Sequence, residues 1–378
     1  MTSDLQFLPT DPQFLLNPYP WLAKMRREAP VFYDKEQQCW MVFRYEDVKR
    51  VLSEWKTFSS IVPKPPEQKD FTQSMVNTDP PKHQSLRALV QKVFTPNRVE
   101  ALAPRINELT HELLAQMKQH KQVDLLQAFS IPLPITVIAE MLGVPLERRE
   151  DFKRWSDGVA GFNQTAIKEM GDYFRELLKE RREHPGNDLI SDLIAAYEDG
   201  EKLTGQEVVD FCILLLSAGN ETTTNLITNT IWCLHEYPDE YQRLRNDLSL
   251  LPSAIEEALR YYSPLVFTKR YTQVETQIGD QTIPAGQFVW VWLASANRDE
   301  HQFENADRFI IDREPNEHFA FSNGIHFCLG APLSRLEAKI ALKALLSEFP
   351  NLRVDSTEPL KPAPNLLVHG LESLSVLL

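Results

Sequence analysis

The sequence predicts a mainly α-helical protein with a small β region, folded as one domain over residues 1–378. Three observations predict this class. Apolar residues recur with the helical period over most of the chain, β-type segments are few and short, and no repeat, low-complexity linker or composition shift marks a domain boundary. A length of 378 residues also suits two or three domains of ordinary size, but the uniform pattern favours one large core.

The individual elements follow from local patterns. Two β regions are expected, a hairpin and a second region that turns at a Gly-Asp pair; they cover residues 31–33 with 39–43, and 274–278 with 282–293. A proline-rich irregular loop is expected at 62–70. Four segments carry an apolar stripe at helical spacing, which predicts amphipathic helices at residues 100–120, 135–142, 170–182 and 332–349.

A longer helix is expected between Thr204 and Pro238. Thr204-Gly-Gln-Glu207 has the form of a capping box, which begins a helix, and proline ends one. Some 32 residues at 1.5 Å each make a helix about 50 Å long. Its first half is apolar on nearly all sides, so we expect it to run through the middle of the protein.

A polar break interrupts the centre of this helix at residues 217–224, Ser-Ala-Gly-Asn-Glu-Thr-Thr-Thr. Glycine costs about 1 kcal/mol inside a helix, and glutamate is rarely fully buried. The break indicates a binding site, with a kink packed against another backbone as the alternative.

The overall composition excludes several classes of protein. With 43% hydrophobic and 25% charged residues the chain is not wholly disordered, and a net charge of −13 argues against nucleic acid or an anionic membrane as its main partner. No apolar run approaches the roughly 18 residues of a membrane helix, and the N-terminus lacks a signal-peptide pattern, so we expect a cytoplasmic protein. The four cysteines form no CxxC pair, which disfavours a zinc site or a disulfide framework.

One decapeptide carries the most specific signal, Phe321-Ser-Asn-Gly324-Ile-His326-Phe-Cys328-Leu-Gly330. Its cysteine stands just before a predicted helix, where backbone N–H groups and the helix dipole stabilise a thiolate. Its glycines permit tight turns and the close approach of a flat ligand. An isolated cysteine is more often a buried structural residue, but five residue types at fixed spacing rarely arise by chance.

This decapeptide resembles the haem-ligating loop of the cytochrome P450 family, in which a cysteine thiolate is the axial iron ligand. The resemblance extends over nearly the whole chain and in the family's order. It covers the helix that contacts the haem propionates, the oxygen-binding groove, the Glu-x-x-Arg motif and the segment before the cysteine loop, at residues 79–87, 218–223, 257–260, and 296–299 with 308–309. It implies a P450 fold with haem b between the long central helix and the helix after Cys328.

The resemblance assigns roles to several charged and aromatic side chains. His83 and Arg87 are four residues apart and share a helix face, and with Arg270 and His326 they are expected to meet the two haem propionates. Taken without the resemblance, such a pair is more often solvated surface. The haem-binding set implied by the resemblance is His83, Arg87, Ala218, Gly219, Arg270, Phe321, Gly324, His326, Cys328 and Gly330, with Cys328 as the metal ligand.

Glu257 and Arg260 are three residues apart, a spacing that usually gives a surface ion pair of little energetic value. The resemblance implies instead a buried structural pair closed by a second arginine, which we place at Arg308. Breaking such a pair from one side is costly.

Glu221 and Thr222 are the predicted catalytic pair. Splitting dioxygen consumes two protons, and the resemblance implies that Thr222 hydrogen-bonds the oxygen while Glu221 relays protons from solvent. Gly219 is expected to leave room for dioxygen. The alternative for Thr222 is a helix threonine bonded back to its own backbone.

An apolar substrate needs an apolar pocket, although each candidate for its wall also suits plain core. The candidates are Ile61, Val62, Met75, Val76, Leu215, Leu265, Val266, Phe267 and Leu366. Residues 159–167 correspond to the family's mobile lid and are short.

The implied function is that of a haem-thiolate monooxygenase, similar to the promiscuous Bacillus-type hydroxylases of fatty acids, terpenoids and steroids. The sequence has no dinucleotide fingerprint, so electrons are expected from a ferredoxin or flavodoxin with its NAD(P)H-dependent reductase. A peroxygenase driven by hydrogen peroxide and a non-catalytic haem-binding protein are the alternatives, and Glu221 with Thr222 argues against both. We expect a monomer.

A basic stripe follows the cysteine loop. Arg335, Lys339 and Lys343 are spaced by four residues, and Lys92 and Arg98 extend the patch. On an acidic chain this stripe predicts a docking surface for an acidic electron donor, with ordinary solvated surface as the alternative.

Overall fold

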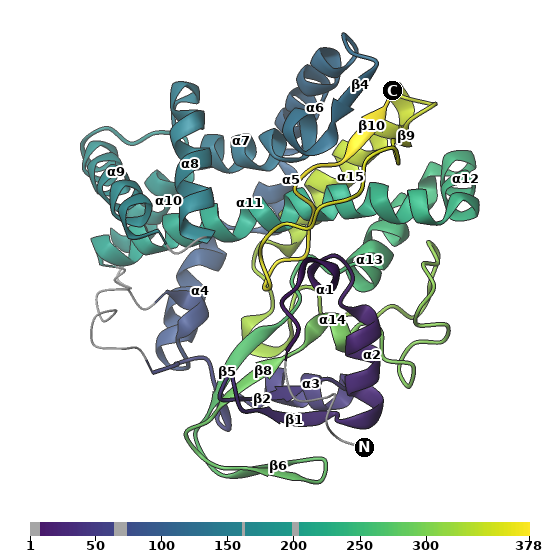
Figure 1. Cartoon of the computed structure of the whole chain (residues 1–378). Helices are drawn as coiled ribbons and strands as arrows, with labels where there is room; N and C mark the ends of the chain where they lie inside the picture. Colours follow the sequence, from purple (N-terminus) through teal and green to yellow (C-terminus); the bar gives the residue numbers. More distant parts are fainter. Residues whose placement is uncertain (1–7, 64–73, 161–162, 199–203) are drawn as a thin grey trace.

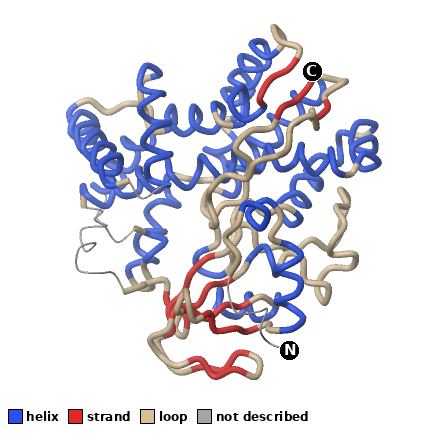
Figure 2. Tube along the Cα trace, viewed as in Figure 1, coloured by secondary structure: helices blue, strands red, loops and turns tan. Residues whose placement is uncertain are grey.

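The structure is a computed structural model that describes residues 8–63, 74–160, 163–198 and 204–378. Helices make up most of it; most strands lie at one end, and a smaller group lies at the opposite end beside the C-terminus (Figures 1 and 2). The helices are α1 (Pro12–Leu16), α2 (Tyr19–Glu28), α3 (Tyr45–Ser53), α4 (Lys82–Val93), α5 (Pro96–Glu100), α6 (Ala103–Met117), α7 (Pro132–Met141), α8 (Arg149–Ala160), α9 (Gln164–Glu183), α10 (Leu189–Glu198), α11 (Gly205–Glu236), α12 (Pro238–Asn246), α13 (Leu251–Tyr261), α14 (Leu293–Ala296) and α15 (Ala331–Glu348).

The strands are β1 (Val31–Asp34), β2 (Cys39–Val42), β3 (Phe58–Ser59), β4 (Gln122–Asp124), β5 (Thr268–Thr272), β6 (Thr276–Ile278), β7 (Gln281–Ile283), β8 (Phe288–Val291), β9 (Arg353–Val354) and β10 (Ser375–Leu377). Within the described residues the main sheet has the order β1-β2-β8-β5-β3. The hairpin β1–β2 and the turn between β6 and β7 are as predicted. The parallel pairing of β2 with β8, which joins the two β regions into one sheet, was not predicted.

The long helix α11 is the axis of the molecule. Its capping box is present, since the Thr204 hydroxyl accepts from the Glu207 amide and the Glu207 carboxylate accepts from the Thr204 amide. The helix runs unbroken from Gly205 to Glu236, crosses the molecule and packs against α7, α8, α9, α13 and α15 (Figure 1). A central helix is therefore confirmed, and the polar break does not interrupt it.

Three buried polar residues in the second half of α11 donate hydrogen bonds, which lowers the cost of burying them. Thr228 and Thr230 bond back to carbonyls one turn earlier. Asn229 donates to two carbonyls outside the helix, those of Tyr262 and His369. These bonds fix α11 to the end of α13 and to the C-terminal loop.

The four amphipathic helices predicted from the apolar stripe are confirmed as α6, α7, α9 and α15, with small shifts at their ends. α15 packs against α6, α11 and α13, so the helix that follows the cysteine loop lies beside the central helix (Figure 1). Among the helices of the described residues, none has both the length and the apolar character needed to cross a bilayer.

Candidate active site

The loop before α15 places Cys328 at the start of that helix. The Cys328 amide donates to the Phe321 carbonyl at 2.9 Å, which closes the loop. Gly324 has a φ of +68° and lies against the Leu52 carbonyl, where a Cβ would stand only 2.8 Å from the oxygen. Glycine is therefore required at this position, and the backbone around the sulfur is fixed.

The Cys328 thiol differs from the other three thiols of the chain, which are fully buried. Burial raises its pKa, but the backbone N–H groups of Gly330 and Ala331 and then the charge of Arg87 act in the opposite direction. Burial raises the pKa of the Cys39 thiol to about 12. Cys328 is thus the thiol whose surroundings suit a thiolate ligand.

A cluster of buried or half-buried basic side chains, two histidines and two arginines, lies next to the cysteine loop. The rings of His83 and His326 are 4.3 Å apart, and Arg87 donates to the Ile325 carbonyl at 3.3 Å. Within the described part of the chain, neither ring nitrogen of His83 nor Nε2 of His326 has a hydrogen-bond partner, although these atoms are buried. Arg270 is 95% buried, and its guanidinium donates to the Thr268 hydroxyl and the Lys269 carbonyl.

The electrostatics of this cluster call for an anion. Burial and then the neighbouring charge of Arg270 lower the pKa of His326 to about 3, and burial lowers the pKa of Arg270 to about 10. Burial and then Arg87 lower the pKa of His83. A buried group of this kind is costly unless a negative partner meets it. Carboxylates brought by a ligand would accept from the N–H groups of these rings and neutralise Arg270, so these residues fit haem propionates.

The polar break of α11 divides its side chains between two directions. Ala218 is exposed and Thr222 is half-exposed in protein atoms, although residues 223–231 of the next turns are buried. Asn220 instead points to α8, where its amide donates to the Ser156 hydroxyl at 3.0 Å. The Thr223 hydroxyl meets that of Ser334 on α15 at 3.1 Å, which ties this part of α11 to the first turn after the cysteine loop.

Gly219 lies where α11 meets α7. A Cβ on Gly219 would stand 2.6 Å from Cδ1 of Ile138 on α7. The glycine therefore permits close packing of α11 against α7, and its place in the helix does not show that it makes room for dioxygen. The contact is with a side chain, so the alternative of a kink packed against another backbone is not what the structure shows, and the role toward dioxygen stays a prediction.

Both residues of the predicted catalytic pair, Glu221 and Thr222, make hydrogen bonds within the protein. The Thr222 hydroxyl donates to the Ala218 carbonyl at 2.8 Å, which is the back-bonded state named above as the alternative. The Glu221 carboxylate accepts from the side-chain amide of Asn365, on the C-terminal loop, at 3.2 Å. Asn365 was missed in the sequence; its place after a proline in an otherwise apolar turn is the only local signal there.

The pair Glu257–Arg260 is fully buried, with side-chain bonds of 2.7 and 2.8 Å. The assignment of Arg308 as its second arginine is wrong. Arg313 closes the pair, since its Nε lies 3.1 Å from both carboxylate oxygens of Glu257. Arg308 is exposed and supplies only its carbonyl, to Arg260 at 2.9 Å, because the chain turns between 308 and 313 and brings the later arginine inward.

The basic stripe on α15 is narrower than predicted. Arg335 makes a two-pronged pair with Glu256, both bonds 2.7 Å, and its guanidinium lies 4.5 Å from the centre of the Phe321 ring. Arg335 therefore braces the cysteine loop and its charge is neutralised. Lys339 and Lys343 are exposed. Two flanking residues were expected to widen the patch. Lys92 is exposed and already interacts with another group, and Arg98 forms an ion pair with Asp192.

The predicted substrate-pocket residues fall into three groups. Phe267 is buried and its ring stacks on Trp290 with centroids 4.6 Å apart, and its assignment to the pocket stays a prediction. Ile61 and Val76, which flank the part of the chain outside the described residues, are exposed large apolar side chains. The others are buried or half-buried near the site segments, namely Val62, Met75, Leu215, Leu265, Val266 and Leu366.

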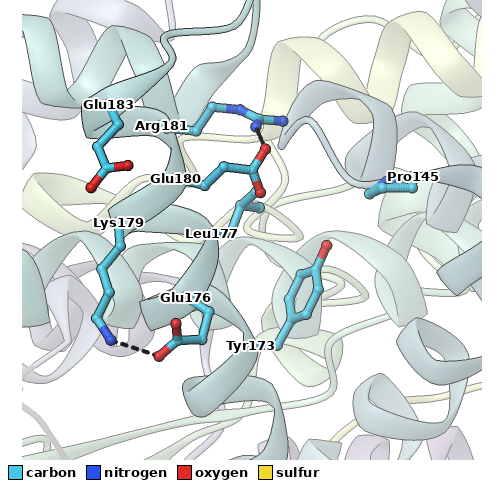
Figure 3. Close-up of a pocket in the computed structure, with 8 residues that line it drawn as sticks. All are labelled: Pro145, Tyr173, Glu176, Leu177, Lys179, Glu180, Arg181 and Glu183. Carbon is cyan, nitrogen blue, oxygen red and sulfur yellow. Dashed lines mark hydrogen bonds and ion pairs between the residues drawn. The ribbon is translucent and has the colours of Figure 1, made fainter.

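A surface hollow along α9 is not part of this site. It lies beside Tyr173 and Pro145, and the ion pairs Lys179–Glu176 and Arg181–Glu180 of α9 line it (Figure 3). None of the predicted site residues lines it. The predicted lid at 159–167 lies partly outside the described residues, because 161–162 are among those not described.

Cys328 lies at the start of α15, beside basic side chains with buried ring nitrogens that lack partners among the described residues, and the central helix α11 packs against α15. This arrangement is that of a haem-thiolate protein. The Cytochrome P450 family model matches residues 13–151 and 124–374. The chain is 44% identical to the putative cytochrome P450 YjiB of Bacillus subtilis over 375 residues, which cover 95% of this chain and 93% of that protein. It belongs to the cytochrome P450 family.

Solved structures agree with this assignment. The fold matches CYP109E1 of Bacillus megaterium in complex with testosterone with a TM-score of 0.93 and 43% identity, covering 97% of this chain and 99% of that one. The same enzyme in complex with corticosterone gives a TM-score of 0.89. The versatile CYP109B1 of Bacillus subtilis gives 0.88 at 42% identity, covering 96% of this chain and 100% of that one. The P450 fold, the haem cofactor implied by the family and the monooxygenase class are thereby confirmed.

Proposed function

We propose that this monooxygenase inserts one oxygen atom of dioxygen into an apolar substrate of fatty-acid, terpenoid or steroid type, with electrons from separate proteins. When bound, haem supplies the activation of dioxygen. The observation that carries the proposal is that one helix holds Glu221 and Thr222 side by side and is bonded through Thr223 to the helix that follows Cys328.

The cysteine loop would hold the iron. The N–H groups of Gly330 and Ala331 direct their partial positive charge at the Cys328 sulfur and favour its thiolate form. Phe321 is braced from outside by the guanidinium of Arg335, which keeps the loop in one shape.

Four side chains would bind the propionates, namely His83, Arg87, Arg270 and His326. Each hydrogen bond to a charged group contributes about 1.5–3 kcal/mol. Because the ring nitrogens of His83 are already buried, they need no reorganisation to accept an anionic partner.

Glu221 and Thr222 would move protons into the site. Glu221 is half-buried, so its carboxylate can exchange protons with water at one side. The Thr222 hydroxyl holds its proton toward the Ala218 carbonyl and is half-exposed, so rotation about one side-chain bond redirects that proton. Neither residue is needed for passive haem binding, which argues against a non-catalytic haem protein, and the pair also argues against a peroxygenase.

The substrate class rests on two supports. The side chains offered near the site are apolar, among them Leu215, Val266 and Leu366. The related enzyme CYP109E1, at 43% identity, has been crystallised with testosterone and with corticosterone. A steroid is therefore the first substrate to test.

Electrons are proposed to come from a ferredoxin or flavodoxin that docks along α15. The exposed charges that remain for such docking are Lys339 and Lys343, one turn apart on the helix that follows Cys328. On a chain of net charge −13 they offer a local positive site to an acidic partner.

The function is tested by offering testosterone with NADH and a surrogate ferredoxin and reductase, and separately with hydrogen peroxide alone. Hydroxylated testosterone in the first assay, in proportion to NADH consumed, is expected. Product only in the second would assign a peroxygenase. If fatty acids and terpenoids also give no product in either assay, the protein binds haem without this activity.

A further inference from the structure

The C-terminal loop from Asn365 to Gly370 crosses over α11 and is bonded on both of its sides. Asn229 of α11 donates to the His369 carbonyl at 3.1 Å. Gly370 lies against Asn225, so closely that a Cβ would stand 2.2 Å from the amide oxygen. The loop is therefore held against the same helix that carries Glu221.

A second set of bonds ties the loop to the segment before β5. The Val266 amide donates to the Leu367 carbonyl at 2.9 Å, and the His369 amide donates to the Pro264 carbonyl at 2.8 Å. With contacts on two elements, the backbone next to Asn365 has little freedom to shift.

The side chain of Asn365 is itself oriented. Its Oδ1 accepts from the backbone amides of Leu367 at 2.9 Å and Val368 at 3.3 Å, an Asx turn. Since those two donors fix the oxygen, the amide nitrogen must face the other way. It faces Glu221, and Nδ2 lies 3.2 Å from Oε1 of that carboxylate.

We infer that Asn365 is a positioning residue, which holds the Glu221 carboxylate in the conformation from which it delivers protons to Thr222. The inference rests on the proposed role of Glu221. Asn365 itself touches no reacting atom. It acts by donating an N–H to one carboxylate oxygen, which restricts the rotamers open to the glutamate.

Two substitutions separate this role from the role of the turn. Asn365→Asp keeps an oxygen that accepts from Leu367 and Val368 but replaces the donor by a second carboxylate. Asn365→Ser keeps a hydroxyl for the turn and is too short to reach Glu221. Asn351→Asp, at an exposed position between α15 and β9, adds the same charge elsewhere and serves as the matched control.

The first readout is infrared spectroscopy of the haem-loaded protein. The carboxylate band that disappears in Glu221→Gln belongs to Glu221. We expect that band to shift in both Asn365 variants and to stay in place in Asn351→Asp. An unchanged band in both Asn365 variants would overturn the inference, whatever Glu221 does in catalysis.

The second readout is turnover. We expect Asn365→Asp to lower kcat for testosterone about fivefold to tenfold with KM nearly unchanged, which is a part of the ~10²–10⁴-fold that a placed acid or base contributes. In the Glu221→Gln background the same substitution should change kcat less than about twofold, since the group it positions is gone. Equal losses in both backgrounds would overturn the inference. If Glu221→Gln leaves turnover intact, the proposed relay fails, and the infrared comparison still decides whether Asn365 holds Glu221.

Discussion

Of the arginines at 308 and 313, only Arg313 joins Arg260 in neutralising the Glu257 carboxylate. Arg313 lies within 3.1 Å and has 6% of its side chain exposed, whereas Arg308 turns its side chain to solvent and offers a carbonyl that any residue would provide. The two positions are five residues apart, so they form a natural pair of variants for testing what holds this buried charge.

We predict that Arg313→Ala destabilises the protein by about 3–5 kcal/mol, because it removes one of the two arginines that neutralise the buried Glu257 carboxylate. Arg308→Ala should cost less than about 1 kcal/mol, since its carbonyl remains. Denaturant unfolding of the two variants checks this. Equal losses of stability would mean that the exposed side chain of Arg308 matters as much as the buried one.

At Thr222 the question is whether the hydroxyl serves the reaction or only its own helix. Thr222→Ala should uncouple the enzyme, so that NADH oxidation continues while hydrogen peroxide is released in place of hydroxylated product. Thr230 is the matched control, because its hydroxyl makes the same kind of bond, to the Leu226 carbonyl at 2.7 Å, and is fully buried. Product per NADH should fall severalfold in Thr222→Ala and stay near the parent value in Thr230→Ala. The same ratio in both variants would assign Thr222 to helix structure alone.

At the scale of one element, α15 carries a buried carboxyl group that the proposed reaction does not use. Glu337 is 99% buried, and its Oε2 has no hydrogen-bond partner among the described residues. Burial raises the pKa of Glu337 to about 8, so the folded protein holds this proton at neutral pH while the unfolded chain releases it near pH 4.5. Stability from this group is thus complete below about pH 4.5 and is lost as the pH rises toward 8.

The isosteric and uncharged variant Glu337→Gln should remove that dependence. We expect the free energy of unfolding of the variant, relative to that of the parent, to increase as the pH rises from about 4.5 to about 8. The increase is up to about 1.4 kcal/mol per pH unit, and the difference is then constant. Urea unfolding at a series of pH values measures the difference. A constant difference across this range would show that Glu337 is ionised in the folded protein.

At the scale of the whole molecule, local patterns predicted the elements better than their partners. The ends of α11 were predicted from Thr204, Glu207 and Pro238, and α15 was predicted from its apolar stripe, because caps and periodicity are local features of the sequence. The parallel pair β2–β8, the choice of Arg313 over Arg308 and the bond from Asn365 to Glu221 join residues distant in sequence or depend on a loop's exact turn. The residues next to each of these positions in the sequence do not predict such contacts.

The same limit explains why the proposed docking surface for the electron donor was predicted too wide. Spacing placed Arg335 on a basic stripe, but it could not reveal that Glu256 of α13 neutralises it. We predict that Lys339→Glu with Lys343→Glu slows reduction by a ferredoxin severalfold at low ionic strength and that salt removes the difference. Reduction by dithionite should be unchanged.

A control for this prediction is Lys168→Glu with Lys179→Glu on α9, which changes the net charge equally at two other exposed lysines. Stopped-flow reduction rates across a salt series compare the two double variants. If both slow reduction to the same degree, only net charge matters and α15 is not the docking surface.

The central claim is that Cys328 supplies the thiolate that holds the haem iron. The most direct measurement is the absorption spectrum of the reduced protein with carbon monoxide, recorded for the parent, for Cys328→Ser and for a variant in which Cys39, Cys212 and Cys233 are all replaced by serine. The parent and the triple variant are predicted to show the long-wavelength Soret band of thiolate-ligated haem, and Cys328→Ser is predicted to lose it. Retention of that band by Cys328→Ser would contradict the account.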